Sequence, residues 1–114
     1  YEPAVLANVT KGMPVYDEEV FGPALPIISF KTNEEAIAIA NDSEYGLGAT
    51  IFSSDTNKAQ NIARDIDSGA VFINNPVKSD PRLPFGGVKK SGYGRELSHY
   101  GIREFVNVKT VWIK

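Results

Sequence analysis

The chain has 114 residues, of which 42% are hydrophobic and 23% charged, a composition typical of a globular protein and not of a disordered one. It contains no cysteine, which excludes a disulfide scaffold, a thiolate metal site and a cysteine nucleophile within these residues. The net charge of −2 is uneven: residues 1–77 hold 4 basic and 11 acidic groups, and residues 78–114 hold 8 basic and 3 acidic groups. Either the basic segment binds an anionic partner or the two halves face each other.

Size and hydropathy set further expectations. A folded monomer of 12.4 kDa should expose about 6,100 Å², against about 18,000 Å² unfolded, which would allow one core. The longest apolar runs are about five or six residues, far short of the roughly 20 that cross a bilayer. No signal peptide is visible, so we expect a cytoplasmic protein without a membrane segment. The cations are spaced among other residues and do not form a run, so nucleic acid is not an expected partner.

The start of the chain resembles the middle of a longer protein. Residues 1–6 look like part of a strand, and the one methionine is Met13. We therefore expect a fragment, which can carry part of a site without its catalyst. Three carboxylates at 17–19 then precede a Phe-Gly-Pro turn at 21–23. This is either a solvated acidic turn or a carboxylate for ribose hydroxyls beside a ring that packs on another flat ring.

Two strand–helix units follow. Residues 25–30 are expected to form a strand, and Thr32 with Glu35 fits the capping box of a helix that stops before Gly46. Residues 49–52 form the next expected strand, and Ser53, Ser54 or Asp55 can cap the helix after it.

That second helix carries the clearest apolar stripe of the chain, at Ala59, Ile62, Ala63 and Ile66. Gly69 is expected to terminate it, and residues 70–74 form a third strand that is apolar on both faces. The pattern predicts an α/β fold with an open parallel βαβαβ sheet layer.

The last third of the chain changes character. Prolines and glycines punctuate a long loop over residues 75–95, which is often a sign of function. A short helix is expected over 96–105. The alternation over 106–113 predicts a strand, which finds no obvious partner in this chain and should pair with missing chain or another subunit.

Isolated motifs carry little here. Gly92-Tyr93-Gly94 lacks the spacing of a dinucleotide loop. The single histidine, His99, is more typical of a surface residue than of a ligand, and no cluster has the spacing of a metal site.

Four motifs in order nevertheless resemble the C-terminal part of the aldehyde dehydrogenase superfamily. They are EEVFGP at 18–23, NDSEYGL at 41–47, GAVFIN at 69–74, and PFGG at 84–87 with SGYGRE at 91–96. The resemblance covers essentially the whole chain. Within the superfamily, residues 78–82 and 96–101 are similar to NAD(P)-dependent succinate-semialdehyde dehydrogenases.

The resemblance implies a covalent mechanism. In the family a cysteine thiolate attacks the aldehyde, hydride passes to the nicotinamide of NAD or NADP, and a glutamate-activated water releases the acid. The cysteine, the oxyanion-hole asparagine and the general base lie upstream of Tyr1 in the family. The chain is therefore expected to be inactive alone and to depend on the missing N-terminal part.

The same resemblance assigns roles to residues of this chain. Glu19 matches the glutamate that holds the nicotinamide ribose, and Phe21 the aromatic beside the nicotinamide. Phe85 matches an aromatic of the substrate pocket, and Ser79 a serine that binds the far carboxylate of succinate semialdehyde. Glu96 matches a glutamate in a proton path, although capping of the following helix is an equally good explanation.

Some expectations concern the loop and the chain as a whole. Arg82 is close enough to help Ser79, without motif support. Residues 1–105 are expected to belong to the catalytic domain and residues 106–114 to form an oligomerisation strand of a homo-oligomer. Two alternatives remain: a non-catalytic assembly module, or a dehydrogenase acting on a different semialdehyde or forming an acyl-CoA.

Overall fold

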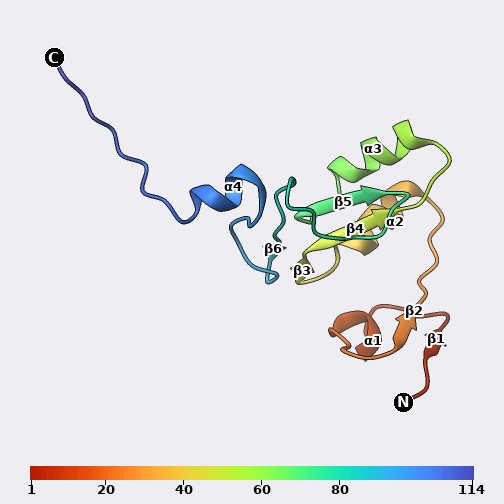
Figure 1. Ribbon diagram of the computed structural model, residues 1–114. Coiled ribbons are helices and arrows are strands. Elements are labelled where there is room, and N and C mark those ends of the chain that lie inside the picture. Colours follow the sequence, from red (N-terminus) through yellow and green to blue (C-terminus); the bar gives the residue numbers. More distant parts are fainter. The chain divides into compact units, whose positions relative to one another are not determined.

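The computed structural model describes all residues from 1 to 114, and its helices and strands fall into two compact units, residues 1–39 and 40–114 (Figure 1). Both mix helices with short parallel strands, in agreement with the expected α/β class. None of the helices combines the length and the apolar character that a membrane crossing requires.

The first unit is built on a two-stranded parallel sheet. Strand β1 (Ala4–Leu6) pairs with β2 (Ala24–Pro26), and the short helix α1 (Pro14–Asp17) lies between them in the sequence. The observed strand β2 is thus shorter than the strand expected over 25–30 and begins one residue earlier. Within this unit β2 pairs with β1, so the expected βαβαβ layer is confirmed only as mixed α/β structure with parallel strands, and its continuity across the two units stays a prediction.

The capping box of the next helix is confirmed. Helix α2 (Asn33–Asn41) begins where the amide of Glu35 donates to Thr32 Oγ1 at 3.2 Å. The Glu35 carboxylate reaches back to the amide of Lys31 at 2.7 Å, one residue before the usual partner. Both hydrogen bonds satisfy donors at a helix start that would otherwise lack partners.

The second unit contains the expected β–α–β crossover. Strand β4 (Gly48–Ile51) runs parallel to β5 (Ala70–Ile73), and helix α3 (Thr56–Arg64) connects them (Figure 1). Of the three candidate caps, Asp55 is the one used, since its Oδ1 accepts the amide of Lys58 at 2.9 Å. The apolar stripe is confirmed at Ala59, which is completely buried.

Gly69 does not end the helix. Helix α3 stops at Arg64 with Asp65 as its C-cap, four residues before Gly69. A Cβ on Gly69 would lie 1.6 Å from the carbonyl oxygen of Gly86, so this glycine permits two backbone segments to touch. The expectation of a C-terminal glycine cap was wrong because the reason for Gly69 lies in a distant segment.

The loop over 75–95 contains one short strand. Strand β6 (Val88–Lys89) pairs antiparallel with β3 (Tyr45–Gly46), and helix α4 (Ser98–Arg103) falls within the expected 96–105. Two ion pairs join the basic and acidic halves of the sequence: Lys90 Nζ lies 2.6 Å from Glu44 Oε2, and Lys89 Nζ lies 3.7 Å from Asp67 Oδ2. These contacts support the second explanation of the uneven charge, in which the acidic and basic parts of the chain face each other.

Residues 106–114 form no strand in this chain, and all of them are exposed. A strand needs a partner for its backbone groups, and residues 1–105 do not provide one. The oligomerisation strand and the boundary at residue 105 therefore stay predictions.

Few apolar side chains are buried within either unit. Val9 is buried in the first unit and Ala59 in the second, whereas many large hydrophobic side chains are exposed, Phe21, Phe105 and Trp112 among them. The expectation of one core for the whole chain stays a prediction.

Candidate functional site

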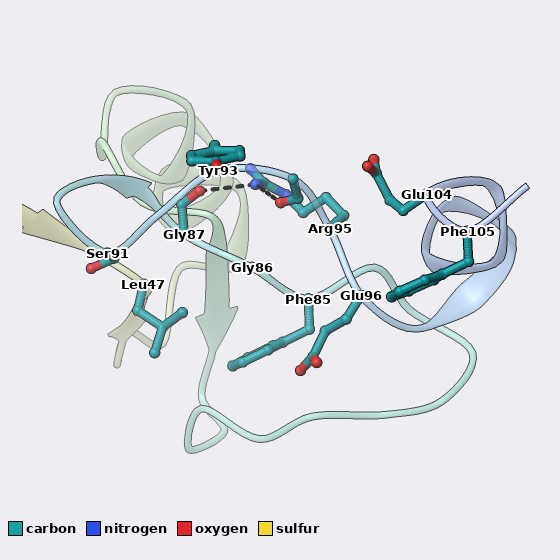
Figure 2. Close-up of a pocket in the computed structure, with 11 residues that line it drawn as sticks. Leu47, Phe85, Gly86, Gly87, Ser91, Tyr93, Arg95, Glu96, Glu104 and Phe105 are labelled. Atoms are coloured by element: carbon teal, nitrogen blue, oxygen red, sulfur yellow. Dashed lines mark hydrogen bonds between the residues drawn. The ribbon is translucent and has the colours of Figure 1, made fainter.

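Phe85 and Glu96, two of the expected site residues, lie next to each other. The amide of Phe85 donates to the carbonyl of Glu96 at 2.9 Å, and the amide of Glu96 donates back at 2.8 Å. An open hollow of about 370 Å³ lies beside this bridge. Figure 2 shows the Phe85 ring and the Glu96 carboxylate on one side of the backbone, and Tyr93 and Arg95 on the other.

Glycines and one arginine fix the walls of this hollow. A Cβ on Gly86 would lie 2.6 Å from the carbonyl oxygen of Gly94, so the two turns approach as closely as their backbones allow. Arg95 Nη1 donates to the carbonyls of Gly87 at 2.9 Å and Gly94 at 2.6 Å (Figure 2). The Phe-Gly-Gly motif thus has a steric cause, and Arg95 is a positioning residue that the sequence did not reveal.

Glu96 does not cap the helix that follows it. The N-cap of α4 is Leu97, whose side chain makes no capping hydrogen bond. Leu97 and Ser98 have φ values of 63° and 52°, a region that non-glycine residues seldom adopt. The role of Glu96 in a proton path stays a prediction.

A second open hollow, of about 400 Å³, is lined by Phe85 and by residues that precede it in the chain. It is lined by strand β5 and by the loop that follows, including Lys78, Asp80 and Leu83. Ser79, the expected ligand for a substrate carboxylate, is exposed and is not one of the lining residues. Its expected contact with substrate therefore stays a prediction.

Arg82 is engaged elsewhere in the loop. Its Nε donates to Asp80 Oδ1 at 2.9 Å and its Nη2 to Asp80 Oδ2 at 2.6 Å. These side-chain hydrogen bonds hold the pKa of Asp80 far below its ordinary value of 3.8. A hydrogen bond from the Arg82 backbone amide to Asp80 lowers it further, to a smaller extent. Asp80 likewise raises the pKa of Arg82. The suggestion that Arg82 assists Ser79 loses support, because its guanidinium already has a bidentate partner.

Glu19 and Phe21 lie in the first unit, on the turn after α1. Both are exposed, and 93% of the Phe21 surface is accessible. Their exposure is compatible with the expected binding of the nicotinamide ribose by Glu19 and of the nicotinamide by Phe21, which stays a prediction. The same turn lacks a glycine-rich loop at a helix N-terminus, so it offers nothing for the pyrophosphate.

The whole chain matches one known family. Residues 1–111 match the sequence profile of the aldehyde dehydrogenase family. The chain belongs to this family. It is 54% identical over 112 residues to the succinate semialdehyde dehydrogenase [NAD(P)+] Sad of Escherichia coli, a match that covers 98% of this chain and 24% of that protein.

Solved structures agree with the sequence match. The succinic semialdehyde dehydrogenase of Streptococcus pyogenes, in complex with NADP+, superposes with a TM-score of 0.95 at 50% identity, over 99% of this chain and 25% of that one. The betaine aldehyde dehydrogenase of Staphylococcus aureus, in complex with NAD+, gives 0.88 at 44% identity, over 92% and 21%. This aldehyde dehydrogenase chain thus spans about a quarter of the length of these relatives.

Two asparagines of the family motifs were not identified as structural from sequence. Asn41 Nδ2 donates to the carbonyl of Asp65 at 2.7 Å, and its Oδ1 accepts the amide of Asp67 at 2.8 Å. Asn74 makes the same pair of contacts with the amide and carbonyl of Ser53, both at 2.8 Å. Each side chain holds two loops together at an end of the β4–α3–β5 crossover. The position of Asn41 in NDSEYGL and of Asn74 in GAVFIN was the sequence feature that could have indicated this structural role.

Proposed function

We propose that the protein containing this chain is an NAD(P)-dependent aldehyde dehydrogenase of the cytoplasm that oxidises a short aldehyde, with succinate semialdehyde as the favoured substrate. The observation that carries the proposal is the 54% identity to a succinate semialdehyde dehydrogenase across 98% of the chain. The two hollows around Phe85 support it, because they place an aromatic wall, a carboxylate and a cation-bearing loop close together.

The chain's own residues would bind, orient and exclude water. Glu19 accepts hydrogen bonds from the ribose hydroxyls, and the exposed ring of Phe21 packs on the nicotinamide. The bound dinucleotide supplies the hydride acceptor. Phe85 would shield the reacting aldehyde from water, and Glu96 would belong to a proton path near the general base.

Other groups must come from outside these residues. The chain has no cysteine, so the thiolate that attacks the aldehyde belongs to the rest of the protein, as does the general base. Residues 106–114 would complete a sheet with another subunit, which fits their exposure and their alternating apolar side chains. The protein would therefore act as a homo-oligomer.

The test compares the full-length protein with the isolated 114-residue chain. Both are incubated with succinate semialdehyde and either NAD+ or NADP+, and reduced dinucleotide is measured against a heat-killed control. We expect the full-length protein to reduce the dinucleotide and the isolated chain not to reduce it. Turnover by the isolated chain would show that a nucleophile other than cysteine is present. No turnover of any aldehyde by the full-length protein would favour a non-catalytic assembly module, and preference for another semialdehyde would reassign the substrate.

A further inference from the structure

Three charged residues lie close together in the loop before Phe85, and two of them neutralise each other. Arg82 binds both oxygens of Asp80 through its guanidinium, at 2.9 and 2.6 Å, and its backbone amide donates to the same carboxylate at 2.9 Å. Lys78 influences Asp80 only through its longer-range field. The residual positive charge of this loop therefore belongs to Lys78.

Lys78 is also the cation that lines the hollow on strand β5. The floor of this hollow consists of apolar residues of β5, and Leu83 and Phe85 contribute to its wall. A volume of about 400 Å³ is ample for an aldehyde of a few carbons. Asn75 and the Asp80 carboxylate also line the hollow, but Arg82 binds both oxygens of that carboxylate. The hollow thus combines an apolar part with one cation, Lys78, which fits an aliphatic aldehyde that carries an anionic group at its far end.

We propose that Lys78 determines the preference for such anionic aldehydes, by attracting the distal carboxylate of the substrate. The inference rests on the proposed function and deepens it, because it moves the recognition of charge from Ser79 and Arg82 to Lys78. Lys78 is exposed, so its attraction acts through water and is weakened by salt. The Asp80–Arg82 pair has a supporting role, since it prevents Asp80 from cancelling the ammonium of Lys78.

The experiment uses the full-length protein and two aldehydes of four carbons, succinate semialdehyde and uncharged butyraldehyde. Lys78→Met keeps a long apolar side chain and removes the charge. We expect kcat/KM for succinate semialdehyde to fall about tenfold, through KM and not through kcat, while the value for butyraldehyde changes less than about twofold. Lys78→Arg should restore most of the preference. Added salt should lower the preference of the wild type and leave that of Lys78→Met unchanged.

Lys58→Met is the matched control, because Lys58 is an exposed lysine of α3 that lines neither hollow described above. It should leave the ratio of the two substrates unchanged. If Lys78→Met lowers kcat/KM equally for both substrates, or for neither, Lys78 does not recognise the substrate carboxylate. The inference then fails while the proposed function stands. If Ser79→Ala alone abolishes the preference, recognition belongs to Ser79. If the wild type oxidises neither aldehyde, the proposed function itself fails.

Discussion

The acidic turn at 18–23 and the glycine-rich loop at 84–96 both carry family motifs, but they are fixed in different ways. In the loop, a backbone bridge joins Phe85 to Glu96, and Arg95 donates to two carbonyls. In the turn, Glu19 and Phe21 are exposed. The loop is therefore held by a side chain as well as by its backbone, whereas the turn is held by backbone hydrogen bonds and its Glu19 and Phe21 side chains are exposed.

Glycines make the same difference visible. A Cβ on Gly69 or Gly86 would collide with backbone atoms, whereas a Cβ on Gly22, in the turn, would meet nothing within 4 Å. A motif glycine in the loop is explained by packing within the chain. Packing within the chain does not explain the motif glycine of the turn, Gly22. The first prediction tests this contrast between the two glycines.

Gly69→Ala should give the largest effect. Its Cβ would overlap the carbonyl oxygen of Gly86, a backbone atom that cannot move without displacing the Phe85 turn. We expect the free energy of unfolding of the full-length protein to fall by about 3 kcal/mol, measured by urea denaturation.

Gly22→Ala is the matched control for that variant, with an expected change within about 0.5 kcal/mol. Equal losses for the two variants would end the comparison, because they would mean that the turn is packed as tightly as the loop.

The second prediction tests the function of the exposed turn. If Glu19 accepts hydrogen bonds from ribose as proposed, Glu19→Gln in the full-length protein removes the negative charge that strengthens a contact worth about 1.5–3 kcal/mol, so the hydride step should slow roughly 10- to 150-fold. Single-turnover kinetics measures this step directly. Glu18→Gln, at the exposed neighbouring carboxylate, is the control and should have little effect. An unchanged rate for Glu19→Gln would mean that residues 17–19 are a solvated turn.

How much could be predicted from sequence also differs between kinds of contact. The β4–α3–β5 crossover and the Thr32–Glu35 capping box were identified correctly, and Asp55 was one of three candidate caps, because these features depend on residues within one helical turn or on one periodic stripe. Gly69 was misassigned because its partner Gly86 is far along the chain. Local patterns cannot show such an approach.

The pairing of strands and the site residues show the same limit. The segment around residue 25 was recognised as a strand, yet its partner β1 could not be read from its own residues. The family resemblance supplied Phe85 and Glu96, which the structure brings together. It did not indicate that Asp80 occupies the guanidinium of Arg82, since that contact depends on the conformation of the loop.

Asn74 allows a third, smaller test, in the second unit. It has a φ of 54°, and its amide holds the backbone of Ser53 through two hydrogen bonds. Asn74→Ala should reduce the free energy of unfolding by about 2 kcal/mol, one for each lost hydrogen bond. Asn74→Gly should lose nearly as much, since it relieves the backbone but lacks the amide.

Asn75→Ala is the control for this pair, because the recorded contact of Asn75, with Thr50, uses its backbone carbonyl. It should change the free energy of unfolding little. If Asn74→Gly were as stable as the wild type, the positive φ and not the amide would explain this asparagine.

The smallest expected effect concerns the Asp80–Arg82 pair, in which Arg82 is exposed and Asp80 half-buried, and the dependence of this pair on pH. Arg82 lowers the pKa of Asp80 in the folded state below its ordinary value of 3.8. The pair should therefore add stability above that ordinary value, and the added stability should disappear as the pH falls from there toward the lower folded pKa. Asp80→Asn should be slightly less stable than the wild type near neutral pH, and the gap between them should narrow below about pH 4. Urea midpoints of the full-length protein measured across this range provide the test, with Glu104→Gln as a control at an exposed carboxylate for which no ion pair is recorded. A gap that persists unchanged in acid would mean that the shape of the Asp80 side chain, and not its charge, holds the loop before Phe85.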